Sequence, residues 1–270
     1  MKIGSDNAIF ESRSNEITSP LNIRRIMQLN GKIAIVTGAS SGIGAEFSRD
    51  LVKKGAIVYG LARRVDRLQI LENELNSGNQ GQFIAVEMDI TKESDLASWL
   101  NNTFGDTTSN LPDILINNAG YGRFAPVEQM PPEEFDRMMS TNMNAIFYLT
   151  RLIVPLMKKN PAVCHIVNVS SVAGLMGNPN ISVYNATKFA LRGFSEALFK
   201  ELREDGIKVS CIFPGSISTE FFDQLGIEIH DHMMRPEDIS ASVLFLLETP
   251  DNFLINEMTL RPLNPKAPAK

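Results

Sequence analysis

The chain has 270 residues, of which 43% are hydrophobic and 21% are charged, and its net charge is -5. This composition is that of an ordinary globular protein with one large core, and it excludes a disordered or fibrous chain. The 26 Lys and Arg residues against 31 Asp and Glu leave no positive surplus for binding phosphates, so no nucleic-acid partner is expected.

Apolar runs that predict buried strands alternate along the chain with segments of helical spacing. In chain order these are a strand over 32–37, a helix over 43–55, a strand over 56–61, a helix over 66–75, a strand over 82–88, a helix up to about 104, strands over 113–117 and 163–169 on either side of a helix over 132–159, a helix over 183–204, a strand over 207–213, a helix over 236–247 and a strand over 255–260. Thr91 is interpreted as a helix cap, and Pro132 suits the first turn of a helix.

Strands that alternate with helices of this length predict a parallel sheet covered on both faces, because a parallel pair needs a crossover connection. The fold class is therefore predicted as α/β, a doubly wound sheet of about seven parallel strands. No internal repeat or linker is visible. We interpret residues 31–263 as a single domain, residues 1–30 as a polar N-terminal extension, and residues 264–270 as a flexible tail.

The cysteine content and the apolar runs indicate the compartment. Cys164 and Cys211 lie in strand-like runs and are too few to staple a secreted scaffold, so they are predicted to be buried free thiols in a reducing, cytoplasmic environment. The longest apolar stretch, residues 145–157, contains Arg151 and Pro155 and is shorter than the roughly 20 residues that span a bilayer. We therefore expect no membrane partner.

A glycine-rich turn, Thr37-Gly38-Ala39-Ser40-Ser41-Gly42-Ile43-Gly44, joins the first strand to the first helix. Glycines at such a turn let the backbone approach a pyrophosphate, and the amino end of the helix attracts an anion. The spacing is G-x3-G-x-G and differs from the common G-x-G-x-x-G fingerprint. We predict a phosphate site formed by Gly38, Ser40, Ser41, Gly42, Ile43 and Gly44. The alternative is a tight turn without a ligand.

Four further motifs follow at the ends of later elements: Asn117-Asn118-Ala119-Gly120, Ser171, Tyr184-x3-Lys188 and Pro214-Gly215. With the glycine turn they stand in the order and spacing of the short-chain dehydrogenase/reductase family, which the chain resembles from about residue 30 to 262. Tyr-x3-Lys alone is weak evidence, whereas five motifs in register are strong evidence. The resemblance implies a Rossmann-type catalytic domain that interconverts a carbonyl and a secondary alcohol with a nicotinamide cofactor.

The chemistry of that reaction points to Tyr184. Hydride transfer to a carbonyl needs a proton donor at the carbonyl oxygen, which the cofactor does not supply. Lys188 lies one helical turn further on, and its charge is expected to favour the phenolate and lower a pKa that is ordinarily near 10. The resemblance implies that Lys188 also holds the nicotinamide ribose, that Ser171 binds the substrate oxygen, and that Asn142 holds a water linking Lys188 to solvent.

Each of these residues has a structural alternative. Tyr184 and Lys188 are also compatible with an amphipathic pair on a solvated helix face. Ser171 is also typical of a turn, and Asn142 of a polar residue that bonds locally inside a helix.

The end of the second strand predicts the cofactor. Ala62 stands where many NAD-preferring relatives place an acid, and Arg63 and Arg64 follow. A guanidinium binds a phosphate bidentately, so we predict NADP(H), with Arg63 as the main contact and Ser41 as a helper. The alternative is an exposed basic pair that contacts nearby acids. The resemblance implies further cofactor contacts from Asp89, Ile90, Asn118, Ala119, Gly120, Pro214, Gly215, Ile217 and Thr219.

The substrate pocket is expected to be formed by the segments after Gly120, between Ser171 and Tyr184, and after Gly215. Candidate lining residues are Arg123, Phe124, Leu175, Met176, Asn178, Phe221 and Phe222. The segment 219–234 is short for a lid, which favours an open site and small or varied substrates. Arg123 is interpreted either as a carboxylate-binding group or as an exposed loop residue. His230 and His232 are close in sequence, but without a third ligand no metal site is predicted.

The chain ends Glu257-Met258-Thr259-Leu260-Arg261-Pro262, without the glycine pair usual in fatty-acid ketoacyl reductases. It therefore resembles more closely the NADP-dependent 3-hydroxy-acid and serine dehydrogenase branch. A 3-oxoacyl-carrier-protein reductase and a non-catalytic NADP-binding regulator are the alternatives, the latter disfavoured by the complete proton relay. An extended-family epimerase is disfavoured by the glycine spacing. The resemblance also implies a homo-oligomer, a tetramer or a dimer.

Overall fold

The computed structural model describes residues 26–78, 80–105 and 110–266. Within these residues seven strands form one sheet in the order β3-β2-β1-β4-β5-β6-β7, and every neighbouring pair is parallel. The predicted α/β class and the doubly wound parallel sheet are confirmed. None of the helices in the described part of the chain has both the length and the apolar character that a membrane crossing requires.

The elements have the following bounds. The strands are β1 (Ile33–Thr37), β2 (Ile57–Ala62), β3 (Gln82–Glu87), β4 (Ile114–Asn117), β5 (Cys164–Val169), β6 (Ile207–Pro214) and β7 (Glu257–Leu260). The α-helices are α1 (Gly42–Lys53), α2 (Val65–Leu75), α3 (Glu93–Phe104), α4 (Pro132–Met139), α5 (Ala145–Met157), α6 (Ser182–Leu202), α7 (Glu220–Gln224) and α8 (Pro236–Leu247).

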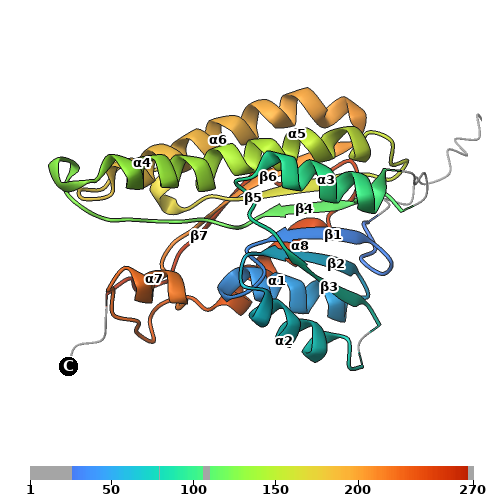
Figure 1. Ribbon diagram of the computed structural model, residues 1–270, viewed down its shortest axis with the longest axis horizontal. Coiled ribbons are helices and arrows are strands. Elements are labelled where there is room, and N and C mark those ends of the chain that lie inside the picture. The colour runs from blue at the N-terminus through green and yellow to red at the C-terminus, as the bar shows by residue number, and fades with distance from the viewer. Residues whose placement is uncertain (1–25, 79, 106–109, 267–270) are drawn as a thin grey trace, which may run out of the picture.

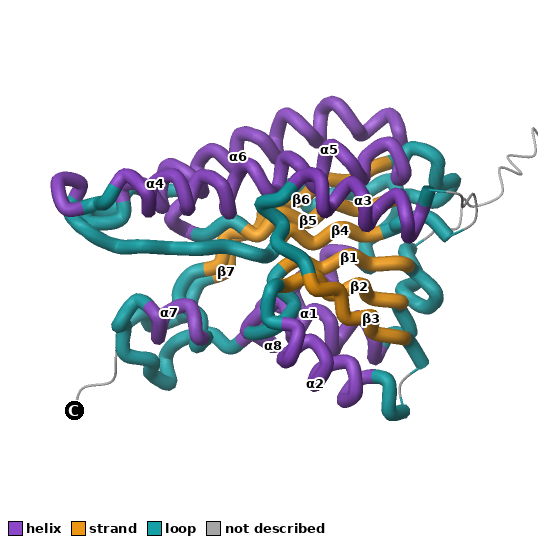
Figure 2. The backbone as a smooth tube through the Cα atoms, in the orientation of Figure 1, coloured by secondary structure: helices purple, strands orange, loops and turns teal. Residues whose placement is uncertain are grey.

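Helices cover the sheet on both faces, with α1, α2 and α8 on one side and α3, α5 and α6 on the other (Figures 1 and 2). The side chains of strand β1 explain why both faces of the sheet are covered. Its residues Ala34 and Val36 pack into the core on the α1 side, whereas Ile33 and Ile35 pack into the core on the α5 side. Because successive side chains of a strand point to opposite faces, an uninterrupted apolar run is what a strand buried on both faces requires.

Three local features differ from the prediction. The long helix over 132–159 is interrupted by a π-helical turn, Ser140–Asn144, that separates α4 from α5. Thr91 is not a helix cap, because its N–H and Oγ1 both donate to Asp89 Oδ1, at 3.1 and 2.7 Å, and α3 begins only at Glu93. The short helix α7 lies in the segment 219–234, for which no helix was predicted.

The first described residues pack against the domain. Met27 and Leu29 are only 7% and 3% exposed and pack into the core on the α1 side, while Ile26 forms a bridge with Pro250. Two residues of the predicted extension, Met27 and Leu29, are therefore part of the core, whereas Ile26 is exposed. The remainder of the predicted extension and the end of the predicted tail lie outside the described residues. Cys164 and Cys211 are buried free thiols, as predicted.

The chain adds strands outward from β1 in one direction and from β4 in the other, so the strand order reverses between these two strands. The connections that follow β1 and β4 run to opposite faces of the sheet (Figure 1). The ends of these strands are tied together. Thr37 Oγ1 accepts hydrogen bonds from the N–H groups of Asn118 and Ala119, both at 3.0 Å, and Asn118 Nδ2 donates to the Thr37 carbonyl at 2.9 Å. A crevice at the carboxyl ends of such strands is where doubly wound sheets bind ligands.

Candidate active site

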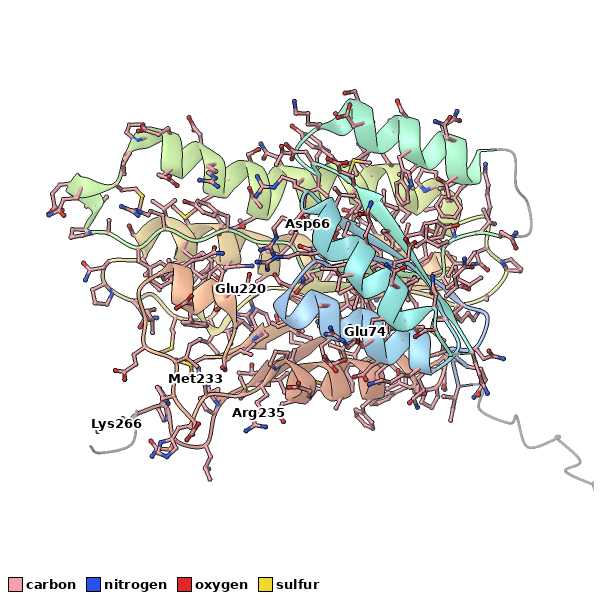
Figure 3. All side chains as sticks on the ribbon, turned by 60° about the horizontal axis from the view of Figure 1, so that its bottom comes forward. Asp66, Glu74, Glu220, Met233, Arg235 and Lys266 are labelled. Atoms are coloured by element: carbon pink, nitrogen blue, oxygen red, sulfur yellow. The ribbon has the colours of Figure 1, made fainter. Side chains whose placement is uncertain are left out.

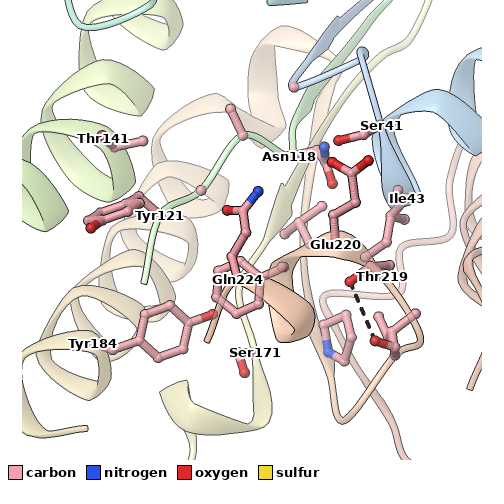
Figure 4. Close-up of a pocket in the computed structure, with 18 of the residues that line it drawn as sticks. Ser41, Ile43, Asn118, Tyr121, Thr141, Ser171, Tyr184, Thr219, Glu220 and Gln224 are labelled. Carbon is pink, nitrogen blue, oxygen red and sulfur yellow. Dashed lines mark hydrogen bonds between the residues drawn. The ribbon is translucent and has the colours of Figure 1, made fainter. Parts of the chain in front are cut away.

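A cavity of about 590 Å³ lies at the carboxyl ends of the strands, and Figure 4 shows part of its lining. Most of the predicted cofactor and catalytic residues lie around it. They are Gly38, Ser40, Ser41, Gly42, Ile43, Arg63, Arg64, Asp89, Ile90, Asn118, Ala119, Gly120, Ser171, Tyr184, Lys188, Pro214, Gly215, Ile217 and Thr219. Gly44 and Asn142 are not among the lining residues and sit behind this surface.

The glycine turn forms a cradle that side chains would fill. Gly38 has a φ of +68°, and a Cβ there would lie 3.0 Å from the Ala119 Cα, while a Cβ on Gly44 would lie 2.3 Å from the Gly38 carbonyl oxygen. Helix α1 begins at Gly42 with no side-chain capping bond from Ser41. The positive end of α1 is therefore available to an anion, and the cradle fits the pyrophosphate of a dinucleotide.

Tyr184 and Lys188 lie one turn apart on α6 and face the end of β5. Their side chains are almost completely buried, with 7% and 4% exposed. Lys188 Nζ donates to the Val169 carbonyl at 3.0 Å and lies 5.6 Å from the centre of the Tyr184 ring. Ser171 is the second residue after β5, and the Tyr184 hydroxyl points into the cavity on the side of Ser171 (Figure 4).

Burial determines the protonation of this pair. It raises the pKa of Tyr184 to about 12, although a hydrogen bond with the Ser171 side chain acts in the opposite direction. Burial also lowers the pKa of Lys188 to about 8. The expected depression of the tyrosine pKa by Lys188 is thus not what the structure shows, because burial raises this pKa and the Ser171 hydrogen bond is what acts against it. Tyr184 is a neutral phenol near pH 7, which suits a proton donor.

Asn142 lies in the π-helical turn between α4 and α5 and is completely buried. Its Oδ1 accepts from the Tyr121 N–H at 2.8 Å, and its Nδ2 donates to the Tyr121 carbonyl at 2.8 Å and to Thr187 Oγ1 at 3.1 Å. A Cβ on Gly120 would lie 3.6 Å from Asn142 Oδ1 and 3.7 Å from Lys188 Nζ. Asn142 therefore fastens the segment after β4 to α6 and faces the same gap as Lys188.

At the other end of the cavity, Arg64 is the arginine that contacts the glycine turn. Its Nη2 donates to Ser41 Oγ at 2.6 Å and to Ser40 Oγ at 3.1 Å. Arg63 is exposed and lies near Asp89. Burial tends to raise the pKa of Asp89, but hydrogen bonds from Thr91 and the charge of Arg63 leave it below its ordinary value. Arg64, and not Arg63, is thus the arginine that lies against the predicted phosphate site.

The space beside Tyr184 is aromatic. The centre of the Tyr184 ring lies 5.6 Å from that of Phe124 and 5.9 Å from that of Phe221, which in turn packs on Phe222 at 5.6 Å. Of the predicted substrate residues, the cavity is lined by Phe124, Asn178, Phe221 and Phe222 but not by Arg123, Leu175 and Met176. Arg123 is exposed, so no predicted cation faces the aromatic wall.

The structure adds lining residues that sequence reasoning missed. Tyr121 donates from its hydroxyl to Glu134 at 2.6 Å, and the Arg137 guanidinium lies 3.9 Å from the centre of the Tyr121 ring. Tyr121 directly follows the Asn-Asn-Ala-Gly motif, so extending that motif by one residue finds it. Arg137 carried no comparable signal, because it is brought to the cavity by α4. Glu220 directly follows Thr219, but its partners Arg64 and Arg67 are far away in sequence.

His230 and His232 lie with their ring centres 6.0 Å apart. His232 Nδ1 is 2.6 Å from the Lys266 carbonyl oxygen. Over the described ranges, the structure contains no group of three or more His, Cys, Asp or Glu side chains arranged to hold a metal ion.

Comparisons with known proteins bear on this cavity. A family model described as short chain dehydrogenase matches residues 32–229. The chain is 36% identical over 244 residues to the farnesol dehydrogenase of Aedes aegypti, covering 87% of this chain and 98% of that protein.

Two solved structures are similar as well. One is a metagenomic short-chain oxidoreductase in complex with NADP, with 31% identity, a TM-score of 0.75, and coverage of 88% of this chain and 100% of that one. The other is a 3-ketoacyl-(acyl-carrier-protein) reductase from Brucella melitensis complexed with NADH, with 29% identity, a TM-score of 0.74, and coverage of 87% and 98%.

Proposed function

The chain belongs to the short-chain dehydrogenase/reductase family of oxidoreductases, and from that premise we propose that it transfers hydride between NADP(H) and a carbonyl or secondary alcohol, with Tyr184 as general acid and base. The observation that carries the proposal is the buried Tyr184 phenol, which points into the cavity between Ser171 and an aromatic wall. Lys188 is fixed one helical turn away by the Val169 carbonyl.

The chain's own residues supply the proton and hold the reacting oxygen. A bound nicotinamide would supply or accept the hydride. In reduction, Tyr184 donates its phenolic proton to the carbonyl oxygen as that oxygen gains negative charge, and the Ser171 hydroxyl stabilises the same oxygen by a hydrogen bond. Lys188 and Asn142 face one gap beside Gly120, which suits a water that returns a proton to Tyr184.

NADP(H) is proposed over NAD(H) because of the groups at the end of β2. Ala62 places no carboxylate there to repel a 2′-phosphate, and Arg64 is held against Ser40 and Ser41 with its guanidinium at the glycine turn. The solved relatives include one complex with NADP and one with NADH, so family membership supports a nicotinamide cofactor, and the residues after β2 support the phosphate.

For the substrate we propose an apolar carbonyl compound or alcohol. The wall formed by Phe124, Phe221 and Phe222 is suited to a hydrocarbon, and the relative from Aedes aegypti is described as a farnesol dehydrogenase. A small 3-hydroxy acid was predicted by resemblance, but the candidate cation for its carboxylate, Arg123, is exposed and does not line the cavity, in agreement with its interpretation as a loop residue. The exposed Phe147 of α5 and Phe189 of α6 support the homo-oligomer as a further part of the proposal.

The proton-transfer role is tested by the pH dependence of the two directions. Alcohol oxidation needs the phenolate, which is the minor form below the raised pKa of about 12, so kcat/KM for oxidation should rise from about pH 6 to about pH 8. Carbonyl reduction needs the phenol and should be flat over that range. Above about pH 8 Lys188 loses its charge, and reduction should fall. Initial rates with NADP⁺ and an apolar secondary alcohol, and with NADPH and the matching ketone, measure both. An oxidation rate that does not change with pH would contradict the role of Tyr184.

A further inference from the structure

A carboxylate from α7 reaches across the mouth of the cavity to two arginines at α2. Glu220 accepts from Arg67 Nη1 at 2.6 and 2.8 Å and from Arg64 Nη1 at 3.0 Å. Figure 3 places Glu220 beside the start of α2, and Figure 4 shows its carboxylate next to Ser41. Arg64 therefore divides its guanidinium between Ser41 on the glycine turn and Glu220 on the opposite rim.

This carboxylate has the chemistry of the phosphate that Arg64 is proposed to bind. A carboxylate and a phosphate monoester both accept paired, charge-assisted hydrogen bonds from one guanidinium. Hydrogen bonds from Arg67 and Arg64 hold the pKa of Glu220 below its ordinary value, so it is an anion at neutral pH. Its side chain is 45% exposed, so solvent can replace its contacts without a large desolvation cost.

We propose that Glu220 is an internal competitor for the 2′-phosphate of NADP(H) at Arg64 and thereby helps to set the cofactor preference. The inference rests on the proposed function, because it assumes that Arg64 binds that phosphate. When the phosphate binds, Arg64 exchanges the Glu220 carboxylate for it, and Arg67 retains Glu220. The 2′-hydroxyl of NAD(H) carries no charge with which to displace the carboxylate.

The exchange predicts that removing either arginine around Glu220 weakens phosphate binding, but for different reasons. Removing Arg64 removes the phosphate contact. Removing Arg67 leaves Arg64 as the remaining one of the two arginine partners of Glu220. Glu220 then competes more strongly with the phosphate for Arg64, which weakens phosphate binding indirectly. The effect of Arg67 should therefore disappear once Glu220 is neutral, whereas a direct Arg67–phosphate contact would persist in either background.

The experiment is a calorimetric titration with two cofactor fragments, adenosine 2′,5′-bisphosphate and adenosine 5′-monophosphate, that do not include the nicotinamide half. The proteins are the wild type, Glu220→Gln, and the control Asp223→Asn, which removes an exposed carboxylate from the same helix α7. We expect Glu220→Gln to bind the bisphosphate about two- to fivefold more tightly, the size typical of an exposed ion pair, and to leave the monophosphate unchanged. Asp223→Asn should change neither, and the gain should shrink at high salt.

Arg67→Ala is then measured alone and together with Glu220→Gln. We expect the single variant to weaken bisphosphate binding and the double variant to bind like Glu220→Gln. An equal loss from Arg67→Ala in both backgrounds would mean that Arg67 contacts the phosphate itself and would overturn the competition. Thermal unfolding followed by circular dichroism verifies that all variants are folded.

The outcomes separate this inference from the function on which it rests. If the wild type prefers the bisphosphate but Glu220→Gln binds it no more tightly, only the competition fails. Weaker binding in Glu220→Gln would show that Glu220 clamps the ligand, which also overturns the inference. If the wild type binds both fragments equally, the proposed preference for NADP(H) fails together with the competition.

Discussion

Replacing Tyr184 with Phe is expected to lower kcat/KM for carbonyl reduction by about 10²- to 10⁴-fold, the range that a positioned general acid contributes. The change removes one oxygen and its proton, while the aromatic contacts with Phe124 and Phe221 are kept. NADPH binding should therefore change little. Initial rates of NADPH oxidation with an apolar ketone, and a fluorescence titration with NADPH, measure the two effects separately.

The matched control for this variant is Tyr148→Phe, which removes a phenol oxygen from α5 at a residue that does not line the cavity. Its turnover should stay within about twofold of the wild type, the level expected of a substitution remote from the chemistry. If Tyr184→Phe keeps more than about a tenth of the wild-type rate, another group donates the proton, and the assignment of the general acid is wrong.

Arg64→Ala is expected to weaken NADPH binding by about 10- to 100-fold, which corresponds to the loss of hydrogen bonds to a charged group. NADH has no 2′-phosphate, so its affinity should change much less. Arg63→Ala should have the smaller effect on NADPH, because Arg63 is exposed, whereas Arg64 is held against Ser40 and Ser41. Titrations of both variants with both reduced cofactors give the four affinities.

The comparison between cofactors decides how these titrations are interpreted. A loss confined to NADPH locates the phosphate at Arg64. An equal loss for NADPH and NADH in Arg64→Ala would mean that the guanidinium supports the glycine turn as a whole, and the phosphate role would be wrong. A larger NADPH loss in Arg63→Ala than in Arg64→Ala would restore the order that the sequence predicts.

The fold was predictable because each strand is an apolar run bounded by turn residues and followed by a helix of regular spacing. Strand β1 and helix α1 illustrate this, since the apolar run before Gly38 predicts a strand and the spacing of Ile43, Phe47 and Leu51 predicts a helix. The π-helical turn at Ser140–Asn144 was not predictable, because one inserted residue barely changes the helical pattern of apolar positions.

The candidate site was partly predictable for a topological reason. Motifs that directly follow parallel strands are brought to one edge of the sheet, so the glycine turn, Asn118 and Ser171 line one cavity. The roles of these residues stay predictions. Contacts from helices could not be predicted in the same way. Glu220 meets Arg64 across 156 positions of sequence, and the protonation of Tyr184 depends on burial, which a sequence does not show.

The central claim is tested most directly by the rate at which the wild-type protein oxidises NADPH in the presence of carbonyl compounds. A panel that runs from small 2- and 3-oxo acids to long-chain and terpenoid ketones and aldehydes is followed by the absorbance of the reduced nicotinamide. We expect turnover, fastest with the apolar members, and a loss of about 10²- to 10⁴-fold in Tyr184→Phe. Turnover of oxo acids alone would contradict the apolar substrate. NADPH binding without turnover of any member would contradict the proposed enzymatic function and favour a cofactor-binding regulator.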